Sequence, residues 1–241
     1  MKSRKKGLNK KKVFGATVAV GVAALALYQV GLFVMVLWYS SINPGSSAFM
    51  DAALVQARRS EQTATLRHQW VPYEKISPHL KRAVVASEDS NFMGHEGIEW
   101  EAIRKAWDYN RRQASAGTAK VRGGSTITQQ LAKNLFLSSS RSYWRKGQEV
   151  ILAYMIENVM SKQRILELYL NLAQWGGQVF GAEAAARHYY KVGAAQLSAY
   201  QAAQLAAMLP NPHYYEKHRN TSYLRSRTNT IQKRMRQVQV P

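Results

Sequence analysis

The sequence predicts an all-α domain that follows a single transmembrane helix. Two observations carry this prediction. One long apolar run near the N-terminus contains no charged residue, and in the rest of the chain apolar residues recur at helical spacing between glycine-containing turns. No convincing strand run, in which apolar and polar residues alternate, appears. With 241 residues, the chain has room for one domain and additional segments.

The first two segments are a basic tail at residues 1–12 and the apolar run at residues 13–39. As a helix the run would be about 40 Å long, enough to cross a hydrocarbon core of about 30 Å with some tilt. "SSINPGSSA" after it can be interpreted as a cleavage site, but the run is too long for a signal-peptide core, so we favour a retained anchor. The basic tail predicts a cytoplasmic N-terminus, and Trp38 and Tyr39 fit an interfacial aromatic belt.

The charge balance predicts an anionic partner. The chain has 34 Lys and Arg residues against 14 Asp and Glu, and subtracting the seven basic residues of the tail leaves +13 on the part beyond the membrane. Outside the cytoplasm, lipid phosphate or a phosphorylated lipid-linked substrate is favoured over nucleic acid, and a merely soluble basic surface is the alternative. The absence of cysteine excludes thiol catalysis, Cys-ligated zinc and disulfides.

The part beyond the membrane is divided into three segments. Residues 40–70 are predicted to be a linker and membrane-proximal segment, with a helix from Met50 to Arg58. Residues 71–215 form the main domain, and residues 216–241 form a basic C-terminal segment. Helical periodicity within the main domain predicts helices at residues 97–113, 126–136, 141–160, 163–173, 181–191 and 197–209.

The first helix of the main domain carries a carboxylate at its end. Ser77 and Pro78 fit an N-cap and a first helical position, and Leu80, Val84 and Glu88 follow on one face. A carboxylate at the end of an apolar stripe is partly desolvated, which suits it to act as a base. The alternative is a surface Glu-Asp pair that ends the helix.

A second stretch joins a Gly-Gly turn to a helix. Thr126 and Gln129 have capping-box spacing, and Gln129, Gln130 and Lys133 lie on overlapping faces. A helix N-terminus after glycine, with a lysine two turns on, suits a phosphate or a sugar rich in hydroxyls. An ordinary capped helix with a polar face is the alternative.

Several charged residues also have simple structural explanations. Arg145 and Glu149, four residues apart, fit a surface salt bridge. His95 has no second histidine at metalloprotease spacing, so we expect a structural hydrogen bond for it. Glu157 and Glu167 lie in apolar helical runs and need partners, for which arginine or backbone groups are favoured over a direct catalytic role.

Taken together, these stretches resemble the peptidoglycan glycosyltransferases, the family that also forms the glycosyltransferase module of bifunctional penicillin-binding proteins. The resemblance covers about residues 71–213. The residues that match its first motif are Glu88, Asp89, Phe92, His95 and Gly97. Those of the second run without a gap over residues 123–130 and continue to Lys133 and Asn134. The third motif is matched by Arg145, Lys146 and Glu149, and the fourth by Ile165, Leu166, Glu167, Tyr169, Leu170 and Asn171.

One position departs from the family pattern. Many members have an acidic residue near Gln201, and we interpret the glutamine as a subgroup difference. The resemblance implies a lysozyme-like fold, in which a larger lobe and a smaller, partly membrane-embedded lobe flank a cleft. The chain ends at Pro241 and has no Ser-x-x-Lys that could serve as a penicillin target, so we expect a monofunctional enzyme without transpeptidase activity.

The resemblance also implies the reaction and the roles of residues. The enzyme would polymerise lipid-linked disaccharide-peptide (lipid II) into β-1,4 glycan strands with inversion, releasing polyprenyl pyrophosphate. Glu88 matches the catalytic base and Glu149 a second essential carboxylate. The residues matched to pyrophosphate and sugar binding are Ser125, Thr126, Gln129, Gln130, Lys133, Asn134, Arg141, Arg145 and Lys146. Those matched to supporting positions are Asp89, Phe92, His95, Gly97, Gly123, Gly124 and Glu167.

Partners and location follow from the same resemblance. The implied partners are lipid II, the growing lipid-linked glycan chain, membrane lipid and other cell-wall synthesis proteins, with no nucleic acid. No cofactor is required, although Mg²⁺ or Mn²⁺ can assist at the pyrophosphate without a dedicated protein site. The implied location is the bacterial cytoplasmic (inner) membrane, with the catalytic domain on the periplasmic or extracellular face.

Two other functions fit parts of the sequence. A lysozyme-like enzyme that cleaves peptidoglycan shares the fold and a catalytic glutamate, but would need no cationic pyrophosphate site. A membrane-tethered basic module could bind anionic lipid or nucleic acid through the C-terminal segment.

Overall fold

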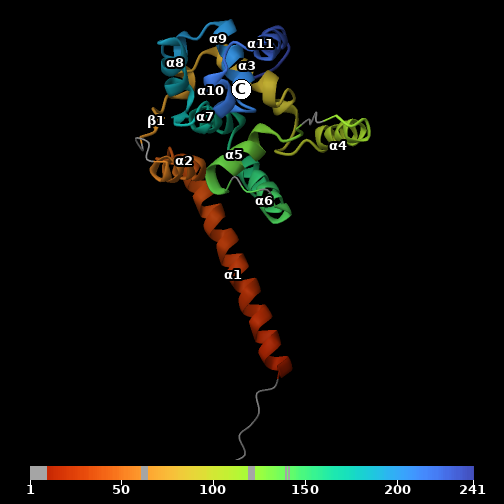
Figure 1. Ribbon diagram of the computed structural model, residues 1–241. Helices are drawn as coiled ribbons and strands as arrows, with labels where there is room; N and C mark the ends of the chain where they lie inside the picture. Colours follow the sequence, from red (N-terminus) through yellow and green to blue (C-terminus); the bar gives the residue numbers. More distant parts are fainter. Residues whose placement is uncertain (1–9, 61–64, 119–122, 139, 141) are drawn as a thin grey trace, which may run out of the picture. The chain divides into compact units, whose positions relative to one another are not determined.

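The computed structural model describes residues 10–60, 65–118, 123–138, 140 and 142–241. The chain divides into two compact units, Met1–Ile42 and Asn43–Pro241 (Figure 1). The described part of the first unit is dominated by one long helix, whereas the second contains the remaining elements.

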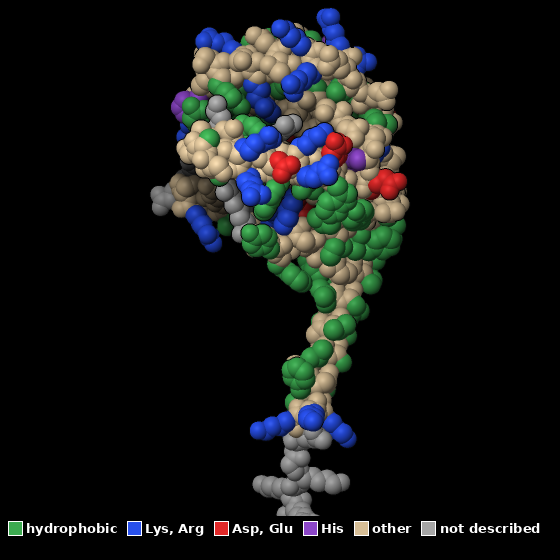
Figure 2. Space-filling view, turned by 90° about the vertical axis from the view of Figure 1, so that its right-hand side faces the viewer, with side chains coloured by type: hydrophobic (Ala, Val, Ile, Leu, Met, Phe, Trp, Pro, Cys, Tyr) green, Lys and Arg blue, Asp and Glu red, His purple; other side chains and the backbone are tan. Residues whose placement is uncertain are grey.

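The first unit contains α1 (Lys10–Tyr39), a helix of 30 residues. It is long and apolar enough to cross a membrane, with a mean hydropathy of 2.3 over 18 residues. The predicted span at residues 13–39 lies within α1, which begins three residues earlier, in the basic tail. The polar Thr17 is accommodated because its hydroxyl donates to the carbonyl of Val13 at 3.0 Å. Figure 2 shows hydrophobic side chains along α1 and Lys or Arg side chains at its end.

The second unit is helical, which confirms the predicted fold class. Its α-helices are α2 (Ala48–Arg59), α3 (Pro78–Glu88), α4 (Trp100–Ser115), α5 (Ile127–Phe136), α6 (Tyr143–Val159), α7 (Lys162–Leu172), α8 (Ala182–Tyr190), α9 (Ala199–Met208), α10 (Pro212–Lys217) and α11 (Ser222–Arg234). Short 3-10 helices occupy Tyr73–Lys75, Phe92–Gly94 and Ala194–Gln196. Within the described ranges the strands are β1 (Arg67–His68) and β2 (Val179–Phe180), which pair in parallel.

Two groups of helices form the core of this unit. In one group, α9 packs against α3 and α11; in the other, α5 packs against α6 and α7 (Figure 1). The α9 residues Leu205, Ala206 and Met208 are fully buried, as are Leu131 of α5 and Leu168 of α7. The C-terminal end of α3 meets the first turn of α5, so the two groups join where the candidate site lies.

The helices α4 and α11 differ in how much of their surface packs against the rest of the second unit. In α4 only Ala106 is buried, and Trp100 and Trp107 are 62% and 71% exposed. The basic segment 216–241, by contrast, contains α11, which is an integral part of the second unit because it packs on α9 and α3. Leu224 and Ile231 form the buried side of α11.

Gly97 has a conformation that explains the glycine at this position. Its φ is +85°, and a Cβ there would lie 2.6 Å from Cγ of Glu157 and 3.2 Å from the carbonyl oxygen of Ala153. We predicted that this helix begins at residue 97, but α4 begins at Trp100. The positive φ of Gly97 explains the difference, because it is incompatible with a right-handed helix.

We expect Gly97→Ala to destabilise the domain by about 1–3 kcal/mol, because it adds a strained backbone conformation to a steric clash. Chemical denaturation monitored by circular dichroism would measure the loss. Gly123→Ala is the matched control, since a Cβ at Gly123 meets nothing within 4 Å. Equal stability of the two variants would contradict the assigned strain.

Candidate active site

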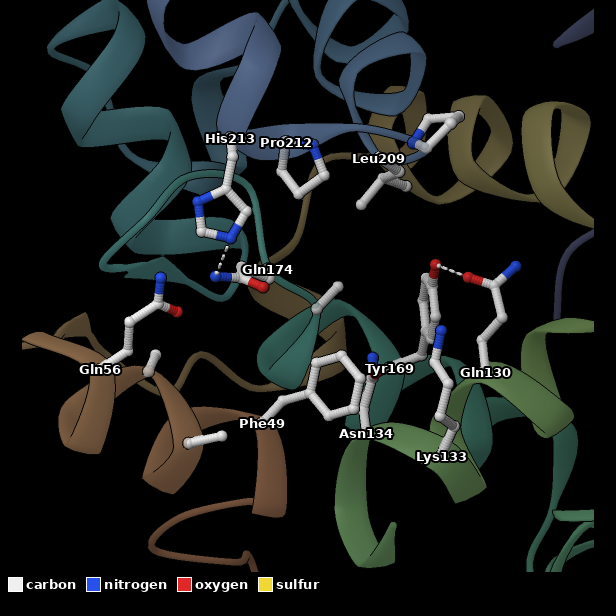
Figure 3. Close-up of a pocket in the computed structure, with 14 residues that line it drawn as sticks. Phe49, Gln56, Gln130, Lys133, Asn134, Tyr169, Gln174, Leu209, Pro212 and His213 are labelled. Atoms are coloured by element: carbon white, nitrogen blue, oxygen red, sulfur yellow. Dashed lines mark hydrogen bonds between the residues drawn. The ribbon is translucent and has the colours of Figure 1, made fainter. Parts of the chain in front are cut away.

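Glu88 lies at the end of α3 with its side chain held at both oxygens. Ser77 caps the start of the helix, as predicted, and the Glu88 side chain is 11% exposed. The Ser87 hydroxyl donates to Oε1 at 2.8 Å, and Nε2 of Gln130 donates to Oε2 at 3.1 Å. The Tyr169 hydroxyl donates to Oε1 of Gln130 at 2.9 Å (Figure 3), which turns the amide nitrogen toward Glu88.

Tyr169 remains a hydrogen-bond donor in this chain of contacts. Burial raises the pKa of its phenol well above the usual value, and the charges of Glu88 and Asp89 raise it further. The orientation of Gln130, and through it that of Glu88, is therefore fixed by a neutral phenol in the core.

Asp89 points into the protein, in contrast to its neighbour. His95 contacts both of its carboxylate oxygens at 2.9 Å through Nε2, and the backbone N–H of Ile127 donates to Oδ2 at 3.0 Å. Nδ1 of His95 accepts from the backbone N–H of Gly97 at 3.1 Å, which places the ring proton on Nε2. The prediction of a structural hydrogen bond for His95 is confirmed, and Asp89 joins the end of α3 to the start of α5.

The start of α5 is a capping box, as predicted. The Thr126 side chain accepts from the backbone N–H of Gln129, whose Oε1 accepts from the backbone N–H of Thr126. Because Asp89 and Thr126 occupy the N–H groups of Ile127 and Gln129, neither is available to a phosphate. Gln129, which the family resemblance matched to substrate binding, is fully buried, and its side chain caps the start of α5.

The turn at residues 123–126 brings α5 close to α4 and α6. A Cβ at Gly124 would lie 3.1 Å from both the carbonyl oxygen of Ala102 and Cα of Ile103, so the turn packs directly on the backbone of α4. On its other side, Nζ of Lys146 donates to the hydroxyl of Ser125 at 3.1 Å.

Glu149 lies between two cations in the first two turns of α6. Arg145 donates to its Oε2 at 2.7 Å and Lys146 to its Oε1 at 2.5 Å. The Glu149 side chain is 3% exposed, so the pair predicted to be a surface salt bridge is buried on its acidic side. Figure 2 shows Lys and Arg side chains gathered around acidic ones on one face of the second unit.

Lys133, one turn beyond Gln130 on α5, is the third cation of this region. Burial lowers the pKa of its amine, Glu149 and Glu88 raise it, and Arg145 and Lys146 lower it further. Lys133 is therefore within electrostatic reach of both carboxylates. Its Nζ lies 5.4 Å from the ring centroid of Phe49, and within the described ranges it makes no hydrogen bond or ion pair.

A cavity of about 470 Å³, here called the inner cavity, opens beside Lys133 (Figure 3). Its lining combines apolar side chains with amides, a phenol, an imidazole and the Lys133 amine, and includes no carboxylate among the residues that the structure describes. The lining residues are Phe49, Ala52, Ala53, Gln56, Gln130, Lys133, Asn134, Tyr169, Ala173, Gln174, Leu209, Pro210, Pro212 and His213. Three of the predicted substrate-binding residues, Gln130, Lys133 and Asn134, thus lie together.

Sequence analysis missed the other walls of this cavity. Phe49 and Gln56 come from α2, in the predicted linker, and His213 from α10, where its Nε2 lies 3.3 Å from Nε2 of Gln174. No motif covers α2, and its place beside α5 depends on tertiary packing.

Arg227 is a further residue that was missed. Its Nη2 donates to the Ser87 hydroxyl at 3.1 Å and lies 3.9 Å from Oε1 of Glu88. It stands among many basic residues of the C-terminal segment, so charge alone did not distinguish it. Arg227 supplies a positive charge beside Glu88 from a helix far away in the sequence.

The remaining predicted residues have structural surroundings. Glu167 pairs with Arg164 at 2.8 Å and accepts from the backbone N–H of Tyr73, as predicted. Glu157 is also paired, but with Lys162 at 2.9 Å and the Thr128 hydroxyl, so the favoured partner types were wrong there. Phe92 is fully buried, with its ring edge-on to that of His95. Arg141 lies outside the described residues.

Comparisons with known proteins identify relatives over most of the chain. The sequence model of the transglycosylase family matches residues 55–236. The chain is 62% identical over 234 residues to a biosynthetic peptidoglycan transglycosylase of Bordetella pertussis, a match that covers 97% of each protein. It is 54% identical over 224 residues to the protein of the same name from Herminiimonas arsenicoxydans, covering 93% of this chain and 95% of the relative. The corresponding protein of Methylobacillus flagellatus is 50% identical over 231 residues, covering 96% and 99%.

Proposed function

The chain belongs to the transglycosylase family, and on that premise we propose that it polymerises lipid II into the glycan strands of peptidoglycan during bacterial cell-wall synthesis. The observation that carries this proposal is a carboxylate held at both oxygens near a group of cations, with a cavity beside them. An inverting transfer to a hydroxyl requires these two parts, a base and a stabiliser for an anionic leaving group.

The reaction is a single displacement. The 4-hydroxyl of the acceptor sugar attacks the anomeric carbon of the donor, the bond from that carbon to the pyrophosphate oxygen breaks, and the hydroxyl proton passes to Glu88. An α-linked donor thereby gives a β-1,4 product and free polyprenyl pyrophosphate. No covalent intermediate between sugar and enzyme is needed.

Glu88 is suited to the role of base by how it is held. Ser87 and Gln130 each donate one hydrogen bond, which fixes the carboxylate and leaves acceptor capacity on both oxygens. Arg227, 3.9 Å from Oε1, places a positive charge beside this carboxylate.

Lys133, Arg145 and Lys146 would stabilise the pyrophosphate as its bond to the sugar breaks. Glu149 contributes by orienting two of these cations, Arg145 and Lys146. We assign Arg141 to the same group from its place in the family pattern. A Mg²⁺ or Mn²⁺ ion at this site would be held mainly by the pyrophosphate of the substrate.

The membrane arrangement that we propose is a single span with a cytoplasmic N-terminus. α1 supports it by length and composition. Exposed aromatic side chains on α4 and at the start of α6, namely Trp100, Trp107, Tyr143 and Trp144, support contact of these helices with the membrane interface. Because both substrates are lipid-linked, confinement to one membrane face raises their effective concentration at the site.

We further propose that the protein works with other cell-wall synthesis proteins and that it has no transpeptidase activity.

The test is polymerisation of labelled lipid II by the full-length protein in detergent, with products separated by gel electrophoresis. We expect a ladder that extends to long glycan strands. Shortening of preformed strands without any polymer would instead support a peptidoglycan-cleaving enzyme.

A further inference from the structure

Lys162 and Glu157 lie outside the sequence motifs of the candidate site, yet they contact two of them. The pair joins the end of α6 to the start of α7, with 2.9 Å between Nζ and Oε1. Its side chains are 19% and 7% exposed, so both are largely withdrawn from water. Desolvation cancels much of the attraction in such a pair, so stability alone does not explain why it is there.

Lys162 holds the stretch of chain that follows Glu88. Its Nζ donates to the backbone carbonyl of His95 at 2.6 Å and lies 4.6 Å from the ring centroid of Phe92. The amine thereby fixes the backbone of the residue whose ring contacts both oxygens of Asp89.

Glu157 holds the first turn of α5. Its Oε1 accepts from the hydroxyl of Thr128 at 2.5 Å, and Thr128 is fully buried. Its side chain also packs close to Gly97, where a Cβ would lie 2.6 Å from Cγ of Glu157. Glu157 therefore contacts both the stretch after α3 and the start of α5.

These contacts form a closed ring that joins the ends of α3 and α6 to the starts of α5 and α7. In order around the ring, the residues are Lys162, His95, Asp89, Ile127, Thr128 and Glu157. Ile127 and Thr128 are neighbours in the sequence, and each of the other links is a hydrogen bond or an ion pair. Glu88 directly precedes Asp89, and Gln130 follows Thr128 by two residues, so both stand next to the ring.

The ring thus surrounds the junction at which Gln130 donates to Glu88 at 3.1 Å. We propose that Lys162 and Glu157 are positioning residues of the reaction, which act through the ring to keep the Glu88 carboxylate against the amide of Gln130. This inference rests on the proposed role of Glu88 as the base. A reacting group displaced by about 1 Å can lose about 10²-fold in rate, so a partial loss of the ring should be measurable.

The test measures kcat and KM for lipid II polymerisation per folded molecule in two variants. Lys162→Met removes the cation that contacts His95 and Glu157, and should lower kcat about tenfold without changing KM. Thr128→Val has nearly the same shape as the wild type, lacks the hydroxyl that Glu157 binds, and should show a smaller loss of the same kind. Lys162→Arg, which keeps a cation with several donors, should recover most of the lost kcat.

A second comparison separates positioning from stability. Gln130→Ala removes the amide that holds Glu88, so residues that act through this contact have little left to lose. In the Gln130→Ala protein, Lys162→Met should therefore lower kcat less than about twofold further. If Lys162→Met does not fold, Thr128→Val serves in the same comparison.

Arg187→Met is the matched control. It breaks a 2.7 Å pair with the buried Glu183 on α8 and involves no residue of the ring. It should leave kcat per folded molecule unchanged. An unchanged kcat in the folded test variants, the same fold-loss with and without Gln130, or an equal loss in Arg187→Met would overturn the proposal. A wild type that forms no polymer would instead reject the proposed function.

Discussion

Glu88→Gln is expected to reduce the polymerisation rate by about 10²- to 10⁴-fold, the usual contribution of a general base. Glutamine has nearly the same shape as glutamate, but its amide cannot take the proton of the acceptor hydroxyl. The hydrogen bond from Ser87 can still form to the amide oxygen, so the fold around the end of α3 should persist. The measurement is the initial rate of glycan formation at matched circular dichroism spectra.

Glu96→Gln is the control for this substitution. Glu96 is an exposed carboxylate in the same sequence motif. Its variant should polymerise at the wild-type rate. Polymerisation by Glu88→Gln at more than about a tenth of the wild-type rate would contradict the role of Glu88, since a general base contributes at least about 10²-fold.

Lys133→Met should lower kcat by about 10²- to 10³-fold, the loss seen when one preorganised group is removed from a site that stabilises developing negative charge. Two other cations assigned to the site, Arg145 and Lys146, are already paired with Glu149, whereas Lys133 makes no ion pair within the described ranges. The loss should therefore exceed that of an exposed lysine. Lys233→Met on α11 is the matched control, because Lys233 is exposed and does not line the inner cavity.

The pH dependence gives a second signature of Lys133. Burial lowers the pKa of its amine, so as pH rises this group loses its positive charge earlier than an ordinary lysine. The rate should fall on the alkaline side accordingly. Lys133→Arg keeps its charge to higher pH and should move this fall upward, whatever its absolute rate. An unchanged alkaline limb in Lys133→Arg would contradict the assignment.

Local signals in the sequence predicted most of the helices and their starts. Ser77 with Pro78 and the Thr126–Gln129 capping box act over three residues or fewer, so they can be recognised without knowledge of the fold. The predicted start of α4 at residue 97 was wrong because Gly97 adopts a left-handed conformation, at a place where a Cβ would clash with Glu157. That constraint comes from another helix.

The residues of the candidate site that belong to sequence motifs could be predicted. Those that reach the site only through tertiary packing could not. Glu88 and Gln130 are brought into contact by the meeting of α3 and α5, whereas Gln56, His213 and Arg227 reach the same region from segments without a motif. Long-range packing of this kind has no local sequence signature. Charge spacing also could not show that Glu149 is buried, since burial depends on α5 lying against α6.

The short helix α5 fixes the spacing of two side chains in the candidate site. Gln130, which donates to the proposed base Glu88, and Lys133, the cation that we propose binds the leaving group, are three residues apart on it, a rise of about 4.5 Å. The capping box fixes the start of α5, and Asp89 joins this start to the end of α3 through the backbone N–H of Ile127. The spacing between Gln130, which contacts Glu88, and the Lys133 cation is thus set by the backbone of one helix. A shift of the flanking helices would leave this spacing unchanged, because both residues belong to α5.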